Sequence, residues 1–542
     1  MFGAGGGTSS YREIEGTDLV ILWGSNARET HPIFFHHLLK GVRRGARLIV
    51  VDPRRTSSAR WADLWLGLEV GSDIALANAV GHEIISAGLV NTEFVRNATS
   101  GYEDYRRCVE AYPPERAEAL TGIPAGVIRE VAHSYAQAPR AQICWTLGIT
   151  EHHNAVDNVL ALINLALLTG HVGREGSGLN PLRGQNNVQG GGDMGAIPNR
   201  LPGFQDVEDE AARSRFEATW GCAVPSRRGM HLSQMFDAME GGRLSSLYVV
   251  GENPAQSEAD QGRALRLLGG LRHLVVQDIY LTRTAAMADV VLPASASWSE
   301  SEGTVTNSER RVQRSRRALE PPPGARDDIQ ILADLARRLG RQWAYESAES
   351  VWSELRGLSP MHRGMTYDRL EALGGIQWPC PSEEHPGTPT LHTRLWSWPL
   401  EGPRAPLSAV EHEPPVDELN DEFPIRLTTG RRLDSFNTGV QSGRFPSPLR
   451  RGETIDLHPA DATRLGVVEG EAVRVVSRRG AVEAPVRLDP GLRPGLAFMT
   501  LHFPDQVPTN RLTIDTYDPK SGTAEFKATA IRVERIVAGS PA

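Results

Sequence analysis

The stretch Asp18-Leu-Val-Ile-Leu-Trp-Gly-Ser-Asn26 decides the fold, because an apolar run ends there on glycine and small polar residues. A second apolar run, Ala46-Arg-Leu-Ile-Val-Val51, ends on Asp52-Pro-Arg54, and a helical stretch lies between the two from about residue 32 to residue 42. Short apolar runs bounded by polar turns are typical of buried strands. Strand, helix and strand in this order predict a right-handed parallel crossover.

The ends of these two strands predict a ligand site, since open parallel sheets bind ligands beyond the carboxyl ends of their strands. Gly24 would let a phosphate-bearing ligand approach the backbone, and the next helix offers its N-terminal amides. Asp52 is placed to accept ribose hydroxyls. The G-x-G-x-x-G fingerprint does not occur here, which disfavours an ordinary NAD site.

Further stretches repeat this arrangement along the chain. Strands that end on Gly, Asp, Asn or Gln are predicted within residues 142–148, 244–254, 274–284 and 289–293, and a turn at 68–76 feeds a helix with Asp73 near its start. Polar residues at strand ends could arise by chance, since loops are polar in any case. A chance origin and a repeated nucleotide-binding design therefore both remain open on the residues alone.

Residues 181–203 form the most unusual stretch, with six glycines and five carboxamides and no helical or alternating period. We expect a loop. It follows the nearly uncharged run 155–168, which predicts a buried helix too short to span a bilayer.

Because carboxamides both donate and accept hydrogen bonds, this loop could read the edge of a planar heterocycle. The candidates for this role are Gln185, Asn186, Asn187 and Gln189. Arg183 adds a rigid cationic fork suited to a carboxylate or a phosphate. The alternative is a structural loop whose carboxamides satisfy one another.

The composition limits the class of protein. The chain has 542 residues, 40% hydrophobic and 23% charged, and a net charge of −8 that argues against a nucleic-acid partner. The Arg-rich stretch 309–317 is local, and it fits either a solvated face or a nucleotide diphosphate. No apolar run is long enough for a membrane span and no signal peptide is visible, so we expect a cytoplasmic protein. Four scattered cysteines suit reduced thiols.

The C-terminal part has a different pattern. Residues 320–324 mark a break, a helix is expected at 325–339, and residues 378–421 suggest a long connector over the surface. Strands are then expected at 423–428 and over 472–488 with a turn at Arg479-Gly480, and a short helix at 461–466. This pattern suggests a small β-barrel.

The loop also carries a family resemblance. Pro181-Leu-Arg-Gly-Gln-Asn-Asn-Val-Gln-Gly190, followed by Asp193-Met-Gly195, resembles the signature of molybdopterin-dependent formate dehydrogenase alpha subunits. These belong to the bis-molybdopterin-guanine-dinucleotide oxidoreductases. Residues 302–313 resemble the family segment E-G-x-x-T-N-x-E-R-R-x-Q, and the barrel region carries matching turns at 428–431, 437–439, 510–513 and 525–527. The resemblance extends over nearly the whole chain.

The resemblance implies an α/β fold with two doubly wound, Rossmann-like nucleotide-binding domains and a C-terminal β-barrel domain. We expect the first domain at residues 1–184 and the second at 185–345, the latter lacking its N-terminal part. A connector at 346–421 and the barrel at 422–536 complete the division.

The resemblance also implies bis-molybdopterin guanine dinucleotide with molybdenum or tungsten. Arg183 would orient formate, with Gln185 in the same pocket. One dinucleotide would contact Gly24, Asn26, Asp52, Arg54, Gly71, Asp73 and Gly148, and the other Gly251, Asn253, Gln277, Asp278, Thr282 and Asp289. The loop contributes Gln185, Asn186 and Asn187, and the barrel Gly430, Arg431, Asn437, Asn510, Phe526 and Lys527.

Two motifs of the resembled family do not occur in this sequence: the cysteine or selenocysteine followed by histidine that holds the metal, and the four-cysteine motif for a [4Fe–4S] cluster. Met1 aligns just after them. We therefore expect that this chain ligates neither group, and that it is either a C-terminal portion of a subunit or one half of a split one. Expected partners are formate and CO₂, an electron-transfer subunit that is NAD-linked or ferredoxin-like, and a separate N-terminal polypeptide.

Three alternatives stay open. The same scaffold could act on another small oxyanion, such as nitrate. The chain could also be a non-catalytic module that binds the pterin dinucleotide or docks to another subunit, or an unstable remnant without function. Adjacent histidines, as at His36-His37 and His152-His153, point in different directions on a helix, so paired metal ligation by either is not expected.

Overall fold

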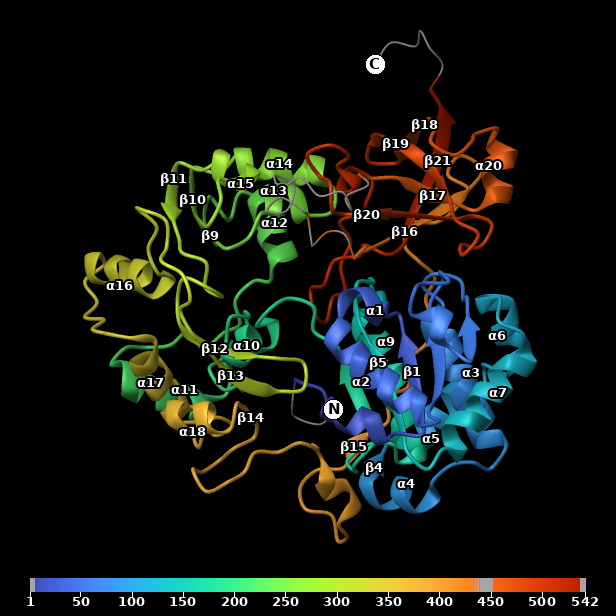
Figure 1. The fold of residues 1–542 in the computed structure, drawn as a ribbon, viewed down its shortest axis with the longest axis horizontal. Coiled ribbons are helices and arrows are strands. Elements are labelled where there is room, and N and C mark those ends of the chain that lie inside the picture. The colour runs from blue at the N-terminus through green and yellow to red at the C-terminus, as the bar shows by residue number, and fades with distance from the viewer. Residues whose placement is uncertain (1–4, 434, 436–437, 439–451, 537–542) are drawn as a thin grey trace.

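The computed structural model describes residues 5–433, 435, 438 and 452–536 (Figure 1). It combines two parallel sheets, each with helices, and a closed six-stranded barrel in the C-terminal region, which confirms the expected fold class. In Figure 1 the first sheet with its helices lies below the barrel, and the second sheet lies beside the barrel. Within these residues no helix is both long and apolar enough to cross a membrane.

The first sheet contains five parallel strands in the order β3-β2-β1-β5-β6. They are β1 (Leu19–Trp23), β2 (Arg47–Val51), β3 (Leu64–Leu66), β5 (Ala141–Trp145) and β6 (Gly178–Pro181). The chain builds β1 to β3 on one side and then crosses to β5 and β6 on the other. The order therefore reverses between β1 and β5, and such a switch point opens a crevice at the carboxyl ends of the strands.

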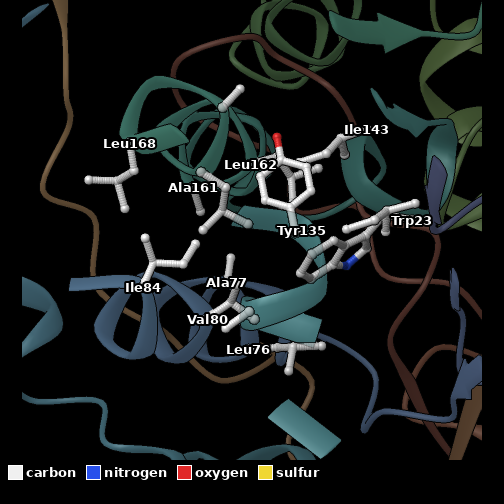
Figure 2. Close-up of a cluster of buried hydrophobic side chains, with 14 of the residues drawn as sticks. Trp23, Leu76, Ala77, Val80, Ile84, Tyr135, Ile143, Ala161, Leu162 and Leu168 are labelled. Atoms are coloured by element: carbon white, nitrogen blue, oxygen red, sulfur yellow. The ribbon is translucent and has the colours of Figure 1, made fainter. Parts of the chain in front are cut away.

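Both faces of this sheet are buried, as the continuous apolar runs predict. In β1, Val20 and Leu22 pack with α2 (Pro32–Arg43), whereas Ile21 and Trp23 lie in the core on the opposite face. That second core includes α3 (Asp73–Ser86), α7 (Ala125–Gln137) and α9 (Ala155–Thr169). Figure 2 shows it, with Trp23 and Tyr135 beside side chains of α3 and α9. The predicted buried helix at 155–168 is confirmed as α9.

The second sheet has three parallel strands in the order β11-β10-β9. They are β9 (Ser246–Val250), β10 (His273–Asp278) and β11 (Val290–Pro293), and the helices α12 (Leu232–Glu240), α14 (Gln261–Gly269) and α15 (Arg283–Ala286) accompany them. Leu274 and Val276 point to the same face of β10, and both pack with Ala285 of α15. The sequence predicts all three strands within a few residues.

The barrel closes in the order β16-β20-β17-β19-β18-β21. Its strands are β16 (Ile425–Gly430), β17 (Ile455–Leu457), β18 (Ala472–Ser477), β19 (Ala481–Leu488), β20 (Leu496–Thr500) and β21 (Thr529–Arg535), with the helix α20 (Pro459–Leu465) beside them. Alternate residues of β18 and β19 point inward, as in a strand with one buried face. The predicted turn at Arg479-Gly480 joins these two strands.

Two expectations about irregular segments are wrong in part. The loop 181–203 contains the helix α10 (Val188–Asp193) and the strand β7 (Arg200–Leu201). Within α10, the side chain of Gln189 donates to Asp193 one turn further along. The connector 378–421 does not stay on the surface. Its apolar residues, spaced without a period, fill the edges of two cores.

The buried apolar side chains of the connector are Trp378, Cys380, Leu391, Leu395, Ala405, Leu407 and Val410. Before them, β12 (Gly303–Thr306), β13 (Arg311–Ser315) and β14 (Ile376–Gln377) form a small antiparallel sheet. The helices α16 (Asp328–Arg338), α17 (Ala348–Leu358) and α18 (Tyr367–Ala372) lie between β13 and β14 in sequence, and α16 is the helix expected at 325–339.

Candidate functional site

A cleft lies between the carboxyl edge of the first sheet and the barrel, and it encloses about 920 Å³ of space that includes open solvent. The sheet contributes residues that follow all five of its strands, and the barrel region contributes the end of β16 and Lys527. Ten of the sequence-predicted cofactor residues line it, namely Gly24, Asn26, Asp52, Arg54, Gly71, Asp73, Gly148, Gly430, Arg431 and Lys527. The structure thus brings together residues that lie far apart in the sequence.

Two glycines form the floor of this cleft at the switch point. Gly24 has a φ of +57°, and a Cβ placed there would lie 2.8 Å from the carbonyl carbon of Gly148. A Cβ on Gly148 would lie 2.5 Å from the carbonyl oxygen of Gly24. The amide of Gly148 donates to that same oxygen at 3.2 Å, as does the Thr146 hydroxyl at 2.7 Å. Only glycine lets the two loops approach this closely.

We therefore expect Gly148→Ala to force the two loops apart. The added methyl would overlap backbone, which cannot rotate away, so the free energy of unfolding should fall by about 1–3 kcal/mol. Urea unfolding measures this change. The matched control is Gly126→Ala in α7, where a Cβ meets nothing within 4 Å and the free energy of unfolding should not fall. Equal stability of both variants would contradict the close approach.

Two buried carboxylates face the cleft. Burial raises the pKa of Asp52 and of Asp73 above the ordinary aspartate value. Asp52 accepts a hydrogen bond from the backbone amide of Arg54 at 2.9 Å, and Asp73 accepts one from the indole nitrogen of Trp23 at 2.8 Å. Partners that hold each carboxylate in one orientation keep it available as an acceptor for hydroxyl or amino groups of a ligand.

Cationic groups line the same cleft. The guanidinium of Arg54 lies 3.5 Å from the ring centre of Phe498, and burial lowers its pKa. Lys527 Nζ lies 2.6 Å from Glu151 Oε2 and donates to the carbonyl of Thr429 at 3.1 Å. Side chains of opposite charge therefore stand within one cleft, as a ligand with both phosphate and base or sugar groups requires.

A buried ion pair fixes the barrel to the first domain beside this cleft. His152 and Glu525 are 3% and 1% exposed, and His152 Nδ1 lies 3.3 Å from Glu525 Oε2. Burial alone would neutralise both groups, but the attraction between them outweighs it, so the pKa of Glu525 is lowered and that of His152 is raised. His152 Nε2 lies 3.1 Å from the carbonyl of Gly148 at the cleft floor. We call the pair His152–Glu525 the interdomain latch.

Sequence reasoning did not assign a role to the latch. Glu525 was quoted within the family motif at 525–527, whereas His152 was considered only as a metal ligand. Sequence reasoning also did not single out His31 as a cleft residue. Burial lowers the pKa of His31 to about 4, so at neutral pH its uncharged ring donates through Nε2 to the carbonyl of Arg183 at 2.8 Å.

The predicted substrate residue Arg183 lies next to the cleft, between Leu182 and Gly184 of its lining. Its side chain donates from Nε to Gln189 Oε1 and from Nη2 to the carbonyl of Gly5, both at 3.1 Å. The residue is open to solvent, yet surrounding protein atoms lower the pKa of its guanidinium. Arg183 is therefore held by the protein while it remains accessible.

The carboxamides of the loop differ in their surroundings. Gln185 and Asn186 are exposed. Asn187 has a φ of +62° and accepts a hydrogen bond from the amide of Thr306 at 2.9 Å, which fastens α10 to β12. Gln189 is buried. Asn187 thus has a hydrogen-bond partner outside the loop, whereas Gln185 and Asn186 are exposed.

The second predicted set lies around the other sheet and does not join this cleft. Gly251, Asn253, Gln277, Asp278 and Thr282 gather at the carboxyl ends of β9 and β10. Asp289 lies at the opposite end, where it accepts from the amide of Leu274 at 2.7 Å. Because β10 and β11 run parallel, a residue that precedes β11 stands at the amino edge of the sheet. Its assignment to the same ligand as the other five does not fit this geometry.

The side chains of this set also have partners within the protein. Asn253 accepts from the Thr284 hydroxyl at 2.7 Å, and Thr282 accepts from the amide of Ala285 at 3.1 Å.

The predicted residues of the barrel region make contacts with both sheets' domains. Asn510 donates to the carbonyl of Ser257 at 2.9 Å, and it thereby joins the barrel region to the second sheet. Phe526 donates its amide to the carbonyl of Glu151 at 3.2 Å. Asn437 lies outside the described residues.

The cysteines are scattered through the structure, as they are in the sequence. All four cysteines carry free thiols, and Cys144 and Cys380 are buried. In the described ranges, no group of three or more His, Cys, Asp or Glu side chains is arranged to hold a metal ion.

Fold and cleft together define an α/β protein in which a β-barrel stands opposite the cleft at the switch point of a parallel sheet. A family model described as molybdopterin oxidoreductase matches residues 4–338, and one described as molydopterin dinucleotide binding domain matches residues 425–530. The first match alone covers more than half of the chain. The chain belongs to the molybdopterin oxidoreductase family.

Individual relatives cover the same range. "F420-dependent formate dehydrogenase 2 subunit alpha" of Methanococcus maripaludis is 41% identical over 99% of this chain and 79% of its own length. "Formate dehydrogenase H" of Escherichia coli is 37% identical over 98% and 75%, and the assimilatory nitrate reductase catalytic subunit of Bacillus subtilis is 33% identical over 98% and 76%. Acetylene hydratase from Pelobacter acetylenicus superposes with a TM-score of 0.75 at 21% identity over 98% of this chain and 79% of that chain, which shows the fold alone.

Proposed function

We propose that this chain is the dinucleotide-binding and formate-binding portion of a molybdopterin-dependent formate dehydrogenase alpha subunit. The observation that carries the proposal is Arg183, which the protein holds by Nε and Nη2 beside the cleft while the residue stays open to solvent. A small carboxylate fits a guanidinium presented in this way. Relatives named as formate dehydrogenases, at 37% and 41% identity, support this substrate.

The residues of the cleft fit a pterin guanine dinucleotide. The glycine floor would admit its backbone-bound phosphates, Arg54 and Lys527 would balance their charge, and Asp52 and Asp73 would accept from ribose or guanine. The hydroxyl of Ser25, directly after Gly24, is buried and makes no hydrogen bond within the described residues. A buried hydroxyl without a hydrogen-bond partner in the protein is expected to bond to a ligand or to a water molecule.

In the proposed reaction, formate loses two electrons and a proton to give CO₂, and the bound metal–pterin group would supply the electron acceptor. The chain itself would bind and orient the carboxylate through Arg183, and the exposed Gln185, two residues further along the chain, would be the second candidate for contact with it. The barrel would keep water from the cleft, because the latch holds it against the first domain.

Several finer points belong to the proposal. The second dinucleotide would lie at the carboxyl ends of β9 and β10, and molybdenum or tungsten would be held outside the described residues. Electrons would pass to a partner subunit, NAD-linked or ferredoxin-like, in the cytoplasm. The names of relatives as alpha subunits support a multi-subunit enzyme.

Arg183→Lys in the assembled enzyme tests the substrate. A single ammonium cannot reproduce the paired donors, so we expect the KM for formate to rise by about 10- to 100-fold. Steady-state kinetics with formate measure it. An unchanged KM would remove Arg183 from the substrate site.

Nitrate is the second candidate substrate, because one relative is a nitrate reductase at 33% identity. Turnover of formate and nitrate by the same preparation separates the two. A purified chain that holds pterin but no molybdenum or tungsten, and turns over neither substrate, would favour a non-catalytic binding module.

A further inference from the structure

A chain of buried hydrogen bonds starts at Arg183 and runs away from the cleft. Arg183 Nε donates to Gln189 Oε1 at 3.1 Å, and Gln189 Nε2 donates to Asp193 Oδ1 at 2.9 Å. The other oxygen of Asp193 accepts from the indole of Trp378 at 2.7 Å. Gln189, Asp193 and Trp378 are 3%, 1% and 1% exposed. We call these three residues the Arg183 support.

The direction of each bond in the support is fixed by chemistry. Trp378 Nε1 can only donate, so one oxygen of Asp193 must accept it. Gln189 has an acceptor on either side of its amide nitrogen, Asp193 Oδ1 and the carbonyl of Gly5 at 3.0 Å. Its NH₂ group must face them, which leaves its oxygen to face Arg183. The orientation of the Gln189 amide is thus determined by Asp193 and not by Arg183.

The support decides which edge of the guanidinium is presented. Nε and Nη2 lie along one edge of the fork, and they are bound by Gln189 and by the carbonyl of Gly5. Across the described residues, Nη1 of Arg183 donates no hydrogen bond. The edge formed by Nη1 and Nη2 is therefore left for a carboxylate, which that edge can grip with two parallel bonds.

We propose that Asp193 is a positioning residue for the substrate arginine, and that it acts through Gln189 to hold the Nη1–Nη2 edge of Arg183 toward the small anion. The inference rests on the proposed function for the identity of that anion, but the orientation of Arg183 can be measured without it. Burial raises the pKa of Asp193 to about 6, so the carboxylate is ionised at neutral pH and both of its oxygens can accept.

Asp193→Asn tests the support without a change of volume. Asparagine has one oxygen, so its NH₂ group must face either Trp378 or Gln189, and both present a donor. If the oxygen stays with Trp378, the Gln189 amide turns over and its NH₂ group faces Arg183 Nε. Crystal structures of the chain should show the bond between Arg183 and Gln189 broken. In the assembled enzyme the KM for formate should rise about tenfold while kcat changes less.

Gln189→Glu combined with Asp193→Asn provides the rescue. In this double variant the new asparagine would accept from Trp378 and donate to the new glutamate, and that glutamate would accept from Arg183, so the net charge and most of the bonds return. We expect Arg183 to recover its position and the KM to recover in part. The control is Asp206→Asn, a half-buried aspartate paired with Arg200 in the neighbouring hairpin, which should leave Arg183 and the KM unchanged.

The outcomes separate the two proposals. An Arg183 that keeps its position in Asp193→Asn overturns the inference, whatever happens to the KM. An Arg183 that moves without a change in KM supports the positioning role of Asp193 but removes Arg183 from formate binding. Movement together with a raised KM, both reversed in the double variant, supports the inference and the proposed substrate site.

Discussion

Glu525→Gln should loosen the barrel from the first domain and lower the free energy of unfolding by about 3–5 kcal/mol, because it leaves one member of a buried ion pair without its partner. The carboxylate of Glu525 accepts from the backbone amides of Lys527 at 2.8 Å, Ala528 at 3.0 Å and His153 at 3.1 Å, as well as facing His152. A glutamine would place its NH₂ group against at least one of these donors. Urea unfolding measures the loss.

The same prediction has a pH dependence with a definite sign. The pKa of Glu525 is lowered from 4.5. Its contribution to the free energy of unfolding is therefore present above pH 4.5 and is lost as the pH falls through the lowered pKa. The pKa of His152 is raised from 6.5. Its contribution to the free energy of unfolding is therefore present below pH 6.5 and is lost as the pH rises through the raised pKa. The free energy of unfolding should therefore differ most between wild type and Glu525→Gln in the range from pH 4.5 to 6.5.

The control for the latch is Glu534→Gln. Glu534 pairs with Arg532 at the surface of β21, where its side chain is 37% exposed. Exposed pairs of this kind contribute about 0–1 kcal/mol, so this variant should unfold nearly as the wild type does. If Glu525→Gln and Glu534→Gln lost the same small amount, the latch would not hold the barrel.

Local sequence pattern was enough to predict β1, β2 and β5 of the first sheet and the edge at which the cleft lies, but not β3 or β6. The sequences of β1 and β2 are apolar on both faces. A strand of that kind is typically found at the centre of a parallel sheet, where both of its faces are buried. Because the carboxyl ends of parallel strands meet at one edge, Gly24 and Asp52 could be placed in one site from the order of the strands alone. In the barrel, β16, β18 and β19 correspond to the strands predicted at 423–428 and 472–488, whereas β17, β20 and β21 were not predicted.

The parts that sequence reasoning missed depend on contacts between distant residues. His152 and Glu525 are separated by 373 residues, and neither lies in a pattern that would indicate its partner. The position of Asp289 required the register of β11 against β10. The connector 378–421 has no period, because each of its buried side chains fills a gap shaped by other elements.

Arg310 is the clearest such case, since neither of the two expected environments for the Arg-rich stretch applies to it. Its side chain is fully buried at 0% exposure. It donates to the carbonyls of Gly7 at 2.6 Å, Thr388 at 2.8 Å and Pro389 at 2.6 Å, and also to that of Trp378. One guanidinium thus joins the N-terminal segment to the connector, and it contacts neither solvent nor the cleft.

Arg310→Met should therefore cost about 4 kcal/mol or more in the free energy of unfolding, because several buried carbonyls lose their donor at about 1–3 kcal/mol each. Urea unfolding would measure it. The matched control is Arg311→Met. Within the described part of the chain, the side chain of Arg311 donates to the carbonyl of Gly374 at the surface, so its removal should cost about 1 kcal/mol or less. Equal losses from the two variants would contradict the role of Arg310.

The loss should also reach the proposed substrate site, because the segment that Arg310 holds at Gly7 includes the Gly5 carbonyl bound by Arg183 and Gln189. We expect hydrogen exchange to rise first in residues 5–10, and the KM for formate to rise in the assembled enzyme even under conditions where the fold persists. Faster exchange in this segment without any effect on the KM would show that Gly5 is dispensable for holding Arg183. The side chain of Arg183 would then be held mainly through Gln189 and Asp193.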